Sequence, residues 1–275
     1  MAANIEFEHV KELNGLRGFT NLFHKENRAW WGTRRWWVNA LLWPVLVCGL
    51  LANMLFVPTI ANLATEAEIT RAGGLTAYII QMGLSVFFEF GTTVLALGVV
   101  VLSLDTILGE KQSGVAEWLL SKPIARRSYI LVKLTANMLP MLVLMVGIPA
   151  AIGYSMLSLR LGEPFHLMPF LSAIGIMALH TLLYLTLTLM LGTLFNSRGP
   201  ILAFALGSVL GGSMLGGLLK PLLYVTPWML PKVASLTAGS QALPAEMGIA
   251  PLVATALWSV VFVIVAMAKF ERTEF

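Results

Sequence analysis

The stretch LDTILGEKQSGVAEWLLSKPIARRSYILVK, residues 104–133, separates two long apolar runs and sets the interpretation of the whole chain. It holds the chain's single aspartate, Asp105, and seven further charged residues: Glu110, Lys111, Glu117, Lys122, Arg126, Arg127 and Lys133. The run on either side is long enough to cross a bilayer, which takes about 20 residues of helix. The stretch is therefore expected to be a water-exposed connection between two membrane-spanning helices.

The composition supports a membrane protein. Hydrophobic residues make up 57% of the 275 residues and charged residues only 12%, whereas soluble domains carry about 25% charged residues. A packed core in water does not need so much apolar surface. The fold class is therefore predicted to be all-α, a polytopic bundle embedded in the membrane.

Apolar runs predict six membrane-spanning helices, at about residues 37–61, 78–104, 134–157, 170–195, 201–219 and 251–268. An even number of crossings places both termini on the same side of the membrane. The predicted organisation is an N-terminal segment (1–36), a single transmembrane domain (37–268) with a long connection at 105–133, and a short tail (269–275).

Lysine and arginine set the orientation. Of 18 such residues, only Arg71, Arg160, Lys220 and Lys232 fall on one predicted side. The other fourteen lie before the first span, in the 104–133 stretch, and at Arg198, Lys269 and Arg272. Basic residues accumulate in cytoplasmic loops, so the charged stretch and both termini are expected to be cytoplasmic, with the chain in the cytoplasmic (inner) membrane.

The segment before the first span has the pattern of an interfacial helix. Leu16, Phe19, Phe23, Trp30 and Trp37 recur at helical spacing, with arginines and lysines between them. Aromatic residues suit the depth of the lipid headgroups, and cations suit anionic lipid. The segment is predicted to lie on the membrane surface in contact with lipids, either as a plain anchor or as a binding element.

Two features mark the region from residue 201 to 248. Glycines four residues apart, Gly207 with Gly211 and Gly212 with Gly216, let helix backbones approach closely, either within one bundle or against another copy of the chain. Three prolines then interrupt an apolar piece too short to span, which predicts a broken or re-entrant outer element before the last span.

Catalytic signatures are missing from the sequence. There is no P-loop to hold a nucleotide and no H-E-x-x-H zinc motif, and a single cysteine, Cys48, rules out an internal disulfide. No catalytic, metal or cofactor-binding residues are predicted, and this chain is not expected to be an enzyme. The basic excess follows from membrane topology, so no nucleic-acid partner is expected.

Two ionisable residues fall inside predicted spans, Glu89 and His180. Such residues are costly in a bilayer and usually face a bundle interior or a watery path. They are candidates for a translocation path, and for a proton-coupled mechanism. The alternative is a neutral side chain hydrogen-bonded to a neighbouring helix.

Inside the charged stretch, Val115, Trp118 and Leu119 have the i, i+3, i+4 spacing of a short amphipathic helix. Gly114 precedes this helix, and Pro123 ends it at or before Lys122. The pattern predicts a surface helix suited to docking a cytoplasmic protein, or else a basic loop that only sets topology.

The same stretch resembles the signature of ATP-binding-cassette exporter permeases of type 2. That signature has an aspartate at the end of the second span and a loop of the form G-E-[KR]-x-x-G-[TS]-x-x-x-L-[LM]-[ST]-x-P-[VI]-x-R-x-x-[YI]. The matching residues are Asp105, Gly109, Glu110, Lys111, Gly114, Leu119, Leu120, Ser121, Pro123, Ile124, Arg126 and Tyr129. Val115 departs from it, standing where a small hydroxyl residue is usual.

The resemblance implies a permease subunit of an ATP-driven exporter. Two permease chains, usually identical, would pair with two ATPase subunits that bind ATP and Mg²⁺, and the short helix would be the coupling helix. The residues expected to contact the ATPase are Glu110, Lys111, Gly114, Glu117, Trp118 and Leu119. Asp105 is expected to pair with Arg126 or Arg127 and, with Pro123, to fix the ends of the loop.

Two other functions stay open at this point. One is a proton-coupled secondary transporter that uses Glu89 and His180. The other is a permease that supports the maturation of a periplasmic metalloenzyme, a role that a member of this same family could serve.

Overall fold

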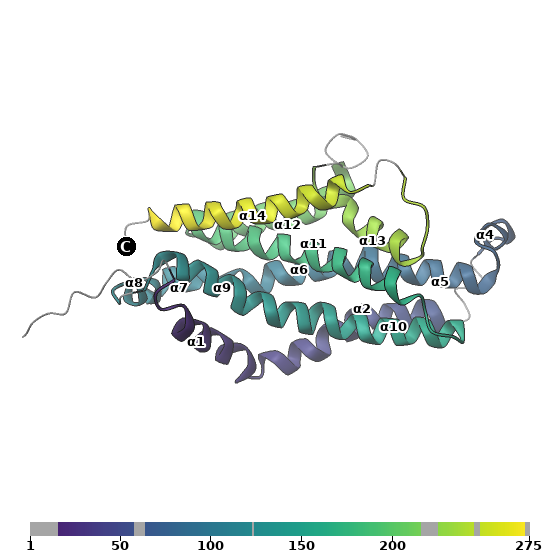
Figure 1. The fold of residues 1–275 in the computed structure, drawn as a ribbon, viewed down its shortest axis with the longest axis horizontal. Coiled ribbons are helices and arrows are strands. Elements are labelled where there is room, and N and C mark those ends of the chain that lie inside the picture. Colours follow the sequence, from purple (N-terminus) through teal and green to yellow (C-terminus); the bar gives the residue numbers. More distant parts are fainter. Residues whose placement is uncertain (1–15, 58–63, 123, 216–224, 245–247, 273–275) are drawn as a thin grey trace, which may run out of the picture.

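The computed structural model describes residues 16–57, 64–122, 124–215, 225–244 and 248–272. Within these ranges the regular structure is helical, with no strand. The long helices lie side by side as one elongated bundle (Figure 1). The all-α prediction is confirmed.

Five helical segments are long and apolar enough to cross a membrane. Three are single helices: α2 (Arg35–Phe56), α11 (Leu167–Leu194) and α14 (Ala250–Glu271). The other two, Leu75–Gln112 and Arg126–Leu161, are composite. The chain is therefore a multi-pass membrane protein.

The remaining predicted span, 201–219, corresponds to α12 (Arg198–Leu215), an 18-residue helix. Its apolar part within the described side chains, Arg198–Gly211, is shorter than the five others. Residues 216–219 lie outside the described residues, so a sixth crossing stays a prediction.

Each composite span contains a π-helical segment. Leu75–Gln112 consists of α5 (Leu75–Ser85), η1 (Val86–Phe90), α6 (Gly91–Ser103) and α7 (Asp105–Gln112). At 1.5 Å per residue these 38 residues cover about 57 Å, well beyond the ~30 Å of a hydrocarbon core. This segment is therefore longer than one crossing requires, and α7, with Asp105, Glu110 and Lys111, forms one end of it.

The second composite span consists of α9 (Arg126–Met141), η2 (Leu142–Gly147) and α10 (Ile148–Leu161). Pro140 lies at the end of α9. Proline has no N–H to donate within the helix, and the wider π-helical turn follows directly after it. π-Helical turns are rare within α-helices, and they occur frequently at functional sites.

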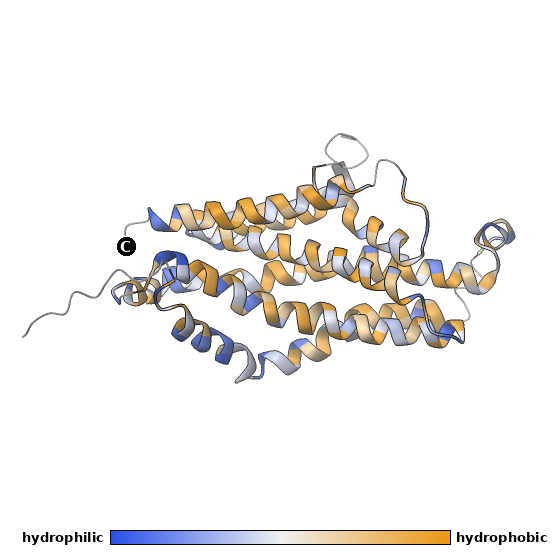
Figure 2. Ribbon diagram, viewed as in Figure 1, coloured by the Kyte–Doolittle hydropathy of each residue, from blue (hydrophilic) through white to orange (hydrophobic). Residues whose placement is uncertain are grey.

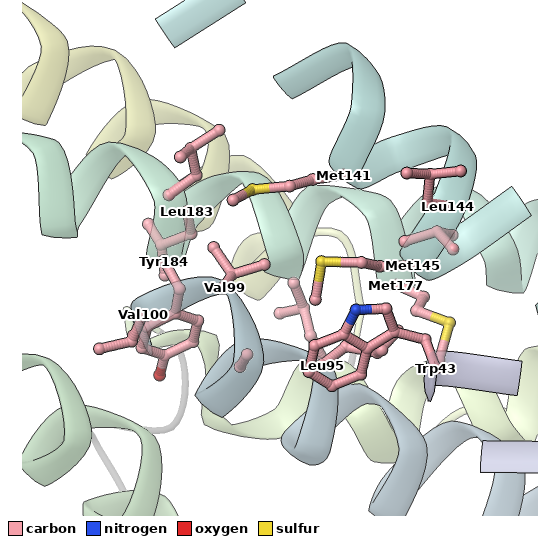
Figure 3. Packing of buried hydrophobic residues seen from close by; sticks show 14 of the residues in the cluster. Trp43, Leu95, Val99, Val100, Met141, Leu144, Met145, Met177, Leu183 and Tyr184 are labelled. Atoms are coloured by element: carbon pink, nitrogen blue, oxygen red, sulfur yellow. The ribbon is translucent and has the colours of Figure 1, made fainter. Parts of the chain in front are cut away.

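The core forms around α11, which packs against α6, α13 (Leu230–Ala238) and α14. Figure 3 shows Trp43, Met145 and Met177 meeting Leu95 and Val99 in this core, with Tyr184 beside Val100. Helix α6 approaches α2 closely because Gly98 has no side chain, and a Cβ there would collide with the indole of Trp43. This glycine sets the spacing between the first two spans.

Short helices lie at the end of the bundle remote from α7. Helix α4 (Glu66–Ala72) begins with a capping box, in which Thr65 and Glu68 each bond the other's backbone N–H. Hydrogen bonds from the backbone N–H and the hydroxyl of Thr65 lower the pKa of the exposed Glu68 carboxyl. The region predicted as a broken outer element contains η4 (Pro227–Met229) and α13 (Leu230–Ala238), each with proline in its first turn.

The opposite end of the bundle is the charged end, formed by α1 (Phe19–Trp31), α7, α8 (Val115–Leu120) and the adjoining ends of α9, α12 and α14. Figure 2 shows many hydrophilic residues here and fewer at the opposite end, at α4 and the end of α10, while most of the length between is hydrophobic. Helix α1 lies obliquely beside this end and packs against α9 (Figure 1). The two short helices predicted from sequence, one before the first span and one in the loop, are both present.

Candidate functional site

The turn between α7 and α8 depends on Gly114. Its φ is 72°, in the left-handed region that residues with a side chain rarely adopt. The chain reverses there, and α8 follows for six residues. Gly114 therefore fixes the turn between α7 and α8, and its contact with an ATPase stays a prediction.

The loop also pairs with the start of α1. The backbone N–H of Ala125 donates to the carbonyl of Arg17 at 3.1 Å. Gly18 has a left-handed φ of 82°, and a Cβ added to it would lie 2.9 Å from Ile124. The start of α1 and the segment after α8 thus form one packed unit.

Glu110 lies inside a cluster of charges rather than on the surface. Its Oε1 is 2.8 Å from Nζ of Lys133, and Oε2 accepts a hydrogen bond of 2.6 Å from the Tyr129 hydroxyl. Glu26 of α1 completes the cluster, with Oε1 2.9 Å from the same Lys133 Nζ. The cluster ties α1, α7 and α9 together, so Glu110 has an intramolecular role, and its contact with an ATPase stays a prediction.

Lys111 points the other way, toward the end of α11. Its Nζ donates to the carbonyls of Gly192, Thr193 and Phe195 at 3.2–3.3 Å. The last carbonyls of a helix have no partner within that helix, and they carry partial negative charge. Lys111 therefore caps the C-terminus of α11 and, like Glu110, holds a position inside the chain instead of at its surface.

The neighbouring residue extends this contact. Gln112 Nε2 donates to the carbonyl of Asn196 at 3.0 Å, in the connection between α11 and α12. Helix α7 is thus attached to α11 and to the segment that follows it.

Asp105 forms its ion pair with Arg198, not with Arg126 or Arg127 as predicted. The two nitrogens of Arg198 approach the two carboxylate oxygens at 2.9 and 3.0 Å, a bidentate contact. Both side chains are substantially exposed to solvent. The prediction was wrong because it paired charges within one loop, whereas the fold brings the start of α12 to the start of α7.

Arg126 and Arg127 attach the start of α9 to the end of α14. Arg126 donates to the carbonyls of Phe270 and Glu271, and Arg127 pairs with the Glu271 carboxylate. The ring of Tyr129 stacks on Phe270 at 4.7 Å between centroids. These residues fix one end of the loop, although their partners come from the last span. Pro123, the other predicted loop-fixing residue, lies outside the described residues.

The exposed part of the loop is one face of α8. The side chain of Trp118 is 59% exposed, and Lys122 places its Nζ 3.6 Å from the centroid of the indole. Glu117 is exposed as well, while Leu119 is buried. Of the six predicted contact residues, Trp118 and Glu117 are presented to solvent, and Leu119 holds α8 onto the chain.

Next to this face lies a groove of about 550 Å³ between α1 and α8. We call it the α1–α8 groove. Its apolar lining is formed by Leu22, Leu119 and Ile124. Its polar lining is formed by Arg17, Asn21, Lys25 and Lys122, with Trp118 beside them. The groove therefore combines an apolar floor with a basic rim.

The two ionisable residues within predicted spans form fewer polar contacts than the charged residues of the loop. Glu89 lies in η1, is half-buried, and forms no side-chain hydrogen bond or ion pair within the described residues. His180 is buried in α11, and its Nδ1 has no hydrogen-bond partner there. No hydrogen bond joins the two, so the structure does not bring them together as a pair.

The predicted packing glycines are only partly described. A Cβ on Gly207 would meet no atom within 4 Å of the described chain, so this position is open rather than packed inside the bundle. Nothing is described for the side-chain positions of Gly212, and Gly216 lies outside the described residues.

Sequence reasoning missed the partners of the loop: Glu26, Arg198, Glu271 and the end of α11. A signal for the first was present, because Lys133 stands in the apolar run YILVKL and a buried lysine needs a carboxylate. No comparable signal pointed to the carbonyls that accept from Lys111.

The comparison with known families agrees with the geometry. The profile described as "ABC-2 family transporter protein" matches residues 20–275, nearly the whole chain. A search among curated proteins found no match. Members of this family are membrane components of transporters that associate with an ABC ATPase. With this match and its membrane-length helices, the chain belongs to the ABC-2 family of transporter proteins.

Proposed function

We propose that this chain is the permease subunit of an ATP-driven exporter in the cytoplasmic (inner) membrane. Two copies of it would pair with two ATPase subunits, with the charged end and both termini in the cytoplasm. ATP and Mg²⁺ would be bound by the ATPases, and this chain would supply the path through the membrane.

The observation that carries the proposal is the α1–α8 groove with Trp118 at its edge. Trp118 is 59% exposed at the charged end of the bundle, with the Lys122 ammonium 3.6 Å from the centroid of its ring. Exposed aromatic residues beside cations are characteristic of binding surfaces, where tryptophan often carries much of the binding energy. The basic rim favours a partner surface with acidic residues.

The contacts of α7 explain how a motion at this groove would reach the membrane. Helix α8 continues from α7 through Gly114. Helix α7 is attached to α9 and α1 by Glu110, to α11 by Lys111 and to α12 by Asp105. A displacement of α8 by an ATPase would therefore move the ends of several spans together. Coupling needs such an element, because ATP binding must favour one arrangement of the spans over another.

The first experiment is affinity capture of the full chain from native membranes, with mass spectrometry of what co-purifies. The wild type is expected to capture a P-loop ATPase. Trp118→Ala combined with Lys122→Glu is expected to reduce that capture about tenfold, because one substitution removes the aromatic contact and the other reverses a charge. Trp37→Ala is the matched control, since Trp37 is an exposed tryptophan at the start of α2, and it should capture as much as the wild type.

Two results would contradict the proposal. One is a wild type that captures no P-loop ATPase. The other is transport by reconstituted vesicles that follows a pH gradient and ignores vanadate, which would support the proton-coupled alternative.

A further inference from the structure

A second, smaller cavity of about 220 Å³ lies at the charged end, between α1 and the ends of three spans. We call it the interfacial cavity. Arg35, the first residue of α2, lines it, as do Leu102 near the end of α6 and Lys133 and Asn137 in α9. Glu26 and Trp30 of α1 cover it. These residues lie near the ends of the predicted spans 37–61, 78–104 and 134–157, which would place the cavity at the depth of the lipid headgroups.

The cavity wall is fixed by buried polar contacts. The Lys133 side chain is only 3% exposed and contacts Glu26 and Glu110. Trp30 Nε1 donates to Asn137 Oδ1 at 3.0 Å, and Asn137 Nδ2 donates to the carbonyl of Lys133 at 2.7 Å. Since these groups satisfy one another, the shape of the cavity is preorganised.

Two charged groups on the wall retain unused hydrogen-bonding capacity. Glu26 contacts both Lys133 and Lys25 through Oε1, and its Oε2 has no partner among the described residues. Arg35 uses Nη2 to donate to the carbonyl of Leu102 at 3.0 Å, and its guanidinium stacks 3.9 Å from the Trp30 ring. Its Nε and Nη1 have no acceptor within the described chain. No ion pair within 4.0 Å joins Arg35 to Glu26.

A carboxylate and a guanidinium that share a cavity without meeting suit a ligand that carries both charges. We propose that the interfacial cavity binds the headgroup of phosphatidylethanolamine. The phosphate accepts from Arg35, whose planar fork matches phosphate oxygens, and the primary ammonium donates to Oε2 of Glu26. Choline headgroups fit poorly because a trimethylated nitrogen has no N–H to donate. Purely anionic headgroups offer no cation to Glu26, and they would meet the carboxylates of Asp105 and Glu110, which also line the cavity.

The lipid fits the location as well as the charges. Helix α1 presents Phe19 and Phe23, whose rings stack with centroids 6.0 Å apart, and both pack against the apolar core of the chain. A lipid whose headgroup enters the cavity would keep its acyl chains among the spans outside it. The inference does not depend on the proposed transport function, because a lipid site at this position would stabilise the fold whatever the chain moves.

The test measures thermal unfolding of the purified full chain in detergent, titrated with phosphatidylethanolamine or with phosphatidylcholine of the same acyl chains. Phosphatidylethanolamine is expected to stabilise the chain with at least fivefold higher apparent affinity. Glu26→Gln and Arg35→Gln are each expected to bring this preference below twofold. Arg28→Gln is the matched control, because Arg28 is an exposed cation of α1 that does not line the cavity, and it should keep the full preference.

Several outcomes would overturn the inference. Equal affinity for the two lipids in the wild type would do so, and that measurement needs no variant to fold. Retention of the preference in both Glu26→Gln and Arg35→Gln would do so too. A third arm uses soluble glycerophosphoethanolamine, and displacement of the lipid at equal concentration would show that the cavity takes free headgroups rather than lipid.

Discussion

The Lys133 ammonium lies 2.8 Å from the Glu110 carboxylate, with the lysine side chain only 3% exposed. Glu110 belongs to the helix that leads into the charged loop, and Lys133 belongs to the span that follows the loop. The pair therefore joins the two ends of the loop, and Glu26 adds α1 to the same ammonium. The densest charge in the chain serves first to assemble its own helices.

Replacing Lys133 by methionine should destabilise the protein strongly. The substitution keeps most of the length of the side chain but leaves two carboxylates without their shared cation. Removing one member of a buried ion pair costs about 3–5 kcal/mol. Unfolding monitored in detergent by heat or denaturant is expected to show a loss of that size. Lys25→Met is the control, because Lys25 is 51% exposed and 3.5 Å from Glu110, and an exposed pair contributes about 0–1 kcal/mol. Similar losses in the two variants would contradict the role given to Lys133.

Lys111 should control the order of the end of α11. In Lys111→Met, the three carbonyls lose a charged donor, and hydrogen bonds to charged groups contribute about 1.5–3 kcal/mol. Backbone amides from 190 to 198 are expected to exchange hydrogen for deuterium faster, while those of α2 keep their rates. In Lys111→Arg a cation remains, so most of the protection should return. Unchanged exchange in Lys111→Met would show that the cap contributes little.

The periodicity of the sequence was sufficient to predict the helices, but it did not predict which residues the helices contact. The amphipathic spacing of Val115, Trp118 and Leu119 predicted α8, and Gly114 does adopt the left-handed conformation that starts it. Spacing within a helix is a local property, so the sequence reports it directly. The same pattern could not tell that Leu119 faces the chain while Trp118 faces water.

The roles of the charged residues depend on tertiary structure. Glu110, Lys111 and Asp105 lie within seven residues of one another, yet they contact α9, α11 and α12 respectively. Their side chains point in different directions around α7, and the partners are 19 to 93 positions away. Charge counting therefore predicted that the loop meets water and a partner, but it could not assign which charges stay inside the chain.

Exchanging the two charges of the Asp105–Arg198 ion pair should preserve the contact between α7 and α12. Asp105→Arg and Arg198→Asp each place like charges side by side, which should loosen the start of α12 from α7 and lower transport coupled to ATP hydrolysis. The double reversal restores an attractive pair and is expected to recover most of that loss. Stability should change by less than about 1 kcal/mol in either single variant, since the pair is exposed. The measurement is a double-mutant cycle on coupled transport in reconstituted vesicles.

Asp105→Arg combined with Arg126→Asp is the comparison for that cycle. Arg126 contacts the end of α14 instead of Asp105, so the combination should behave as the sum of its two single losses. Recovery with Arg126 and not with Arg198 would contradict the pairing found here.

Gly98→Ala should destabilise the bundle at the contact between the first two spans. An added Cβ would collide with the Trp43 ring, which is held by a hydrogen bond of 2.8 Å from Nε1 to Asn39 Oδ1. Because the ring cannot move aside freely, overpacking should cost about 1–3 kcal/mol. Thermal unfolding in detergent is expected to show this loss. Gly175→Ala is the control, since a Cβ at that exposed position of α11 would meet no atom within 4 Å of the described chain.

A second substitution distinguishes collision from a general effect of replacing glycine. Trp43→Phe alone removes ring volume and the bond to Asn39, so it should destabilise the chain by leaving a cavity. Combined with Gly98→Ala, the smaller ring leaves room for the new methyl group. The double variant is therefore expected to be more stable than the sum of the two losses predicts, with a coupling of about 0.5–3 kcal/mol, typical of residues in contact. Strict additivity would mean that Gly98 is needed for a reason other than the close approach of α2 and α6.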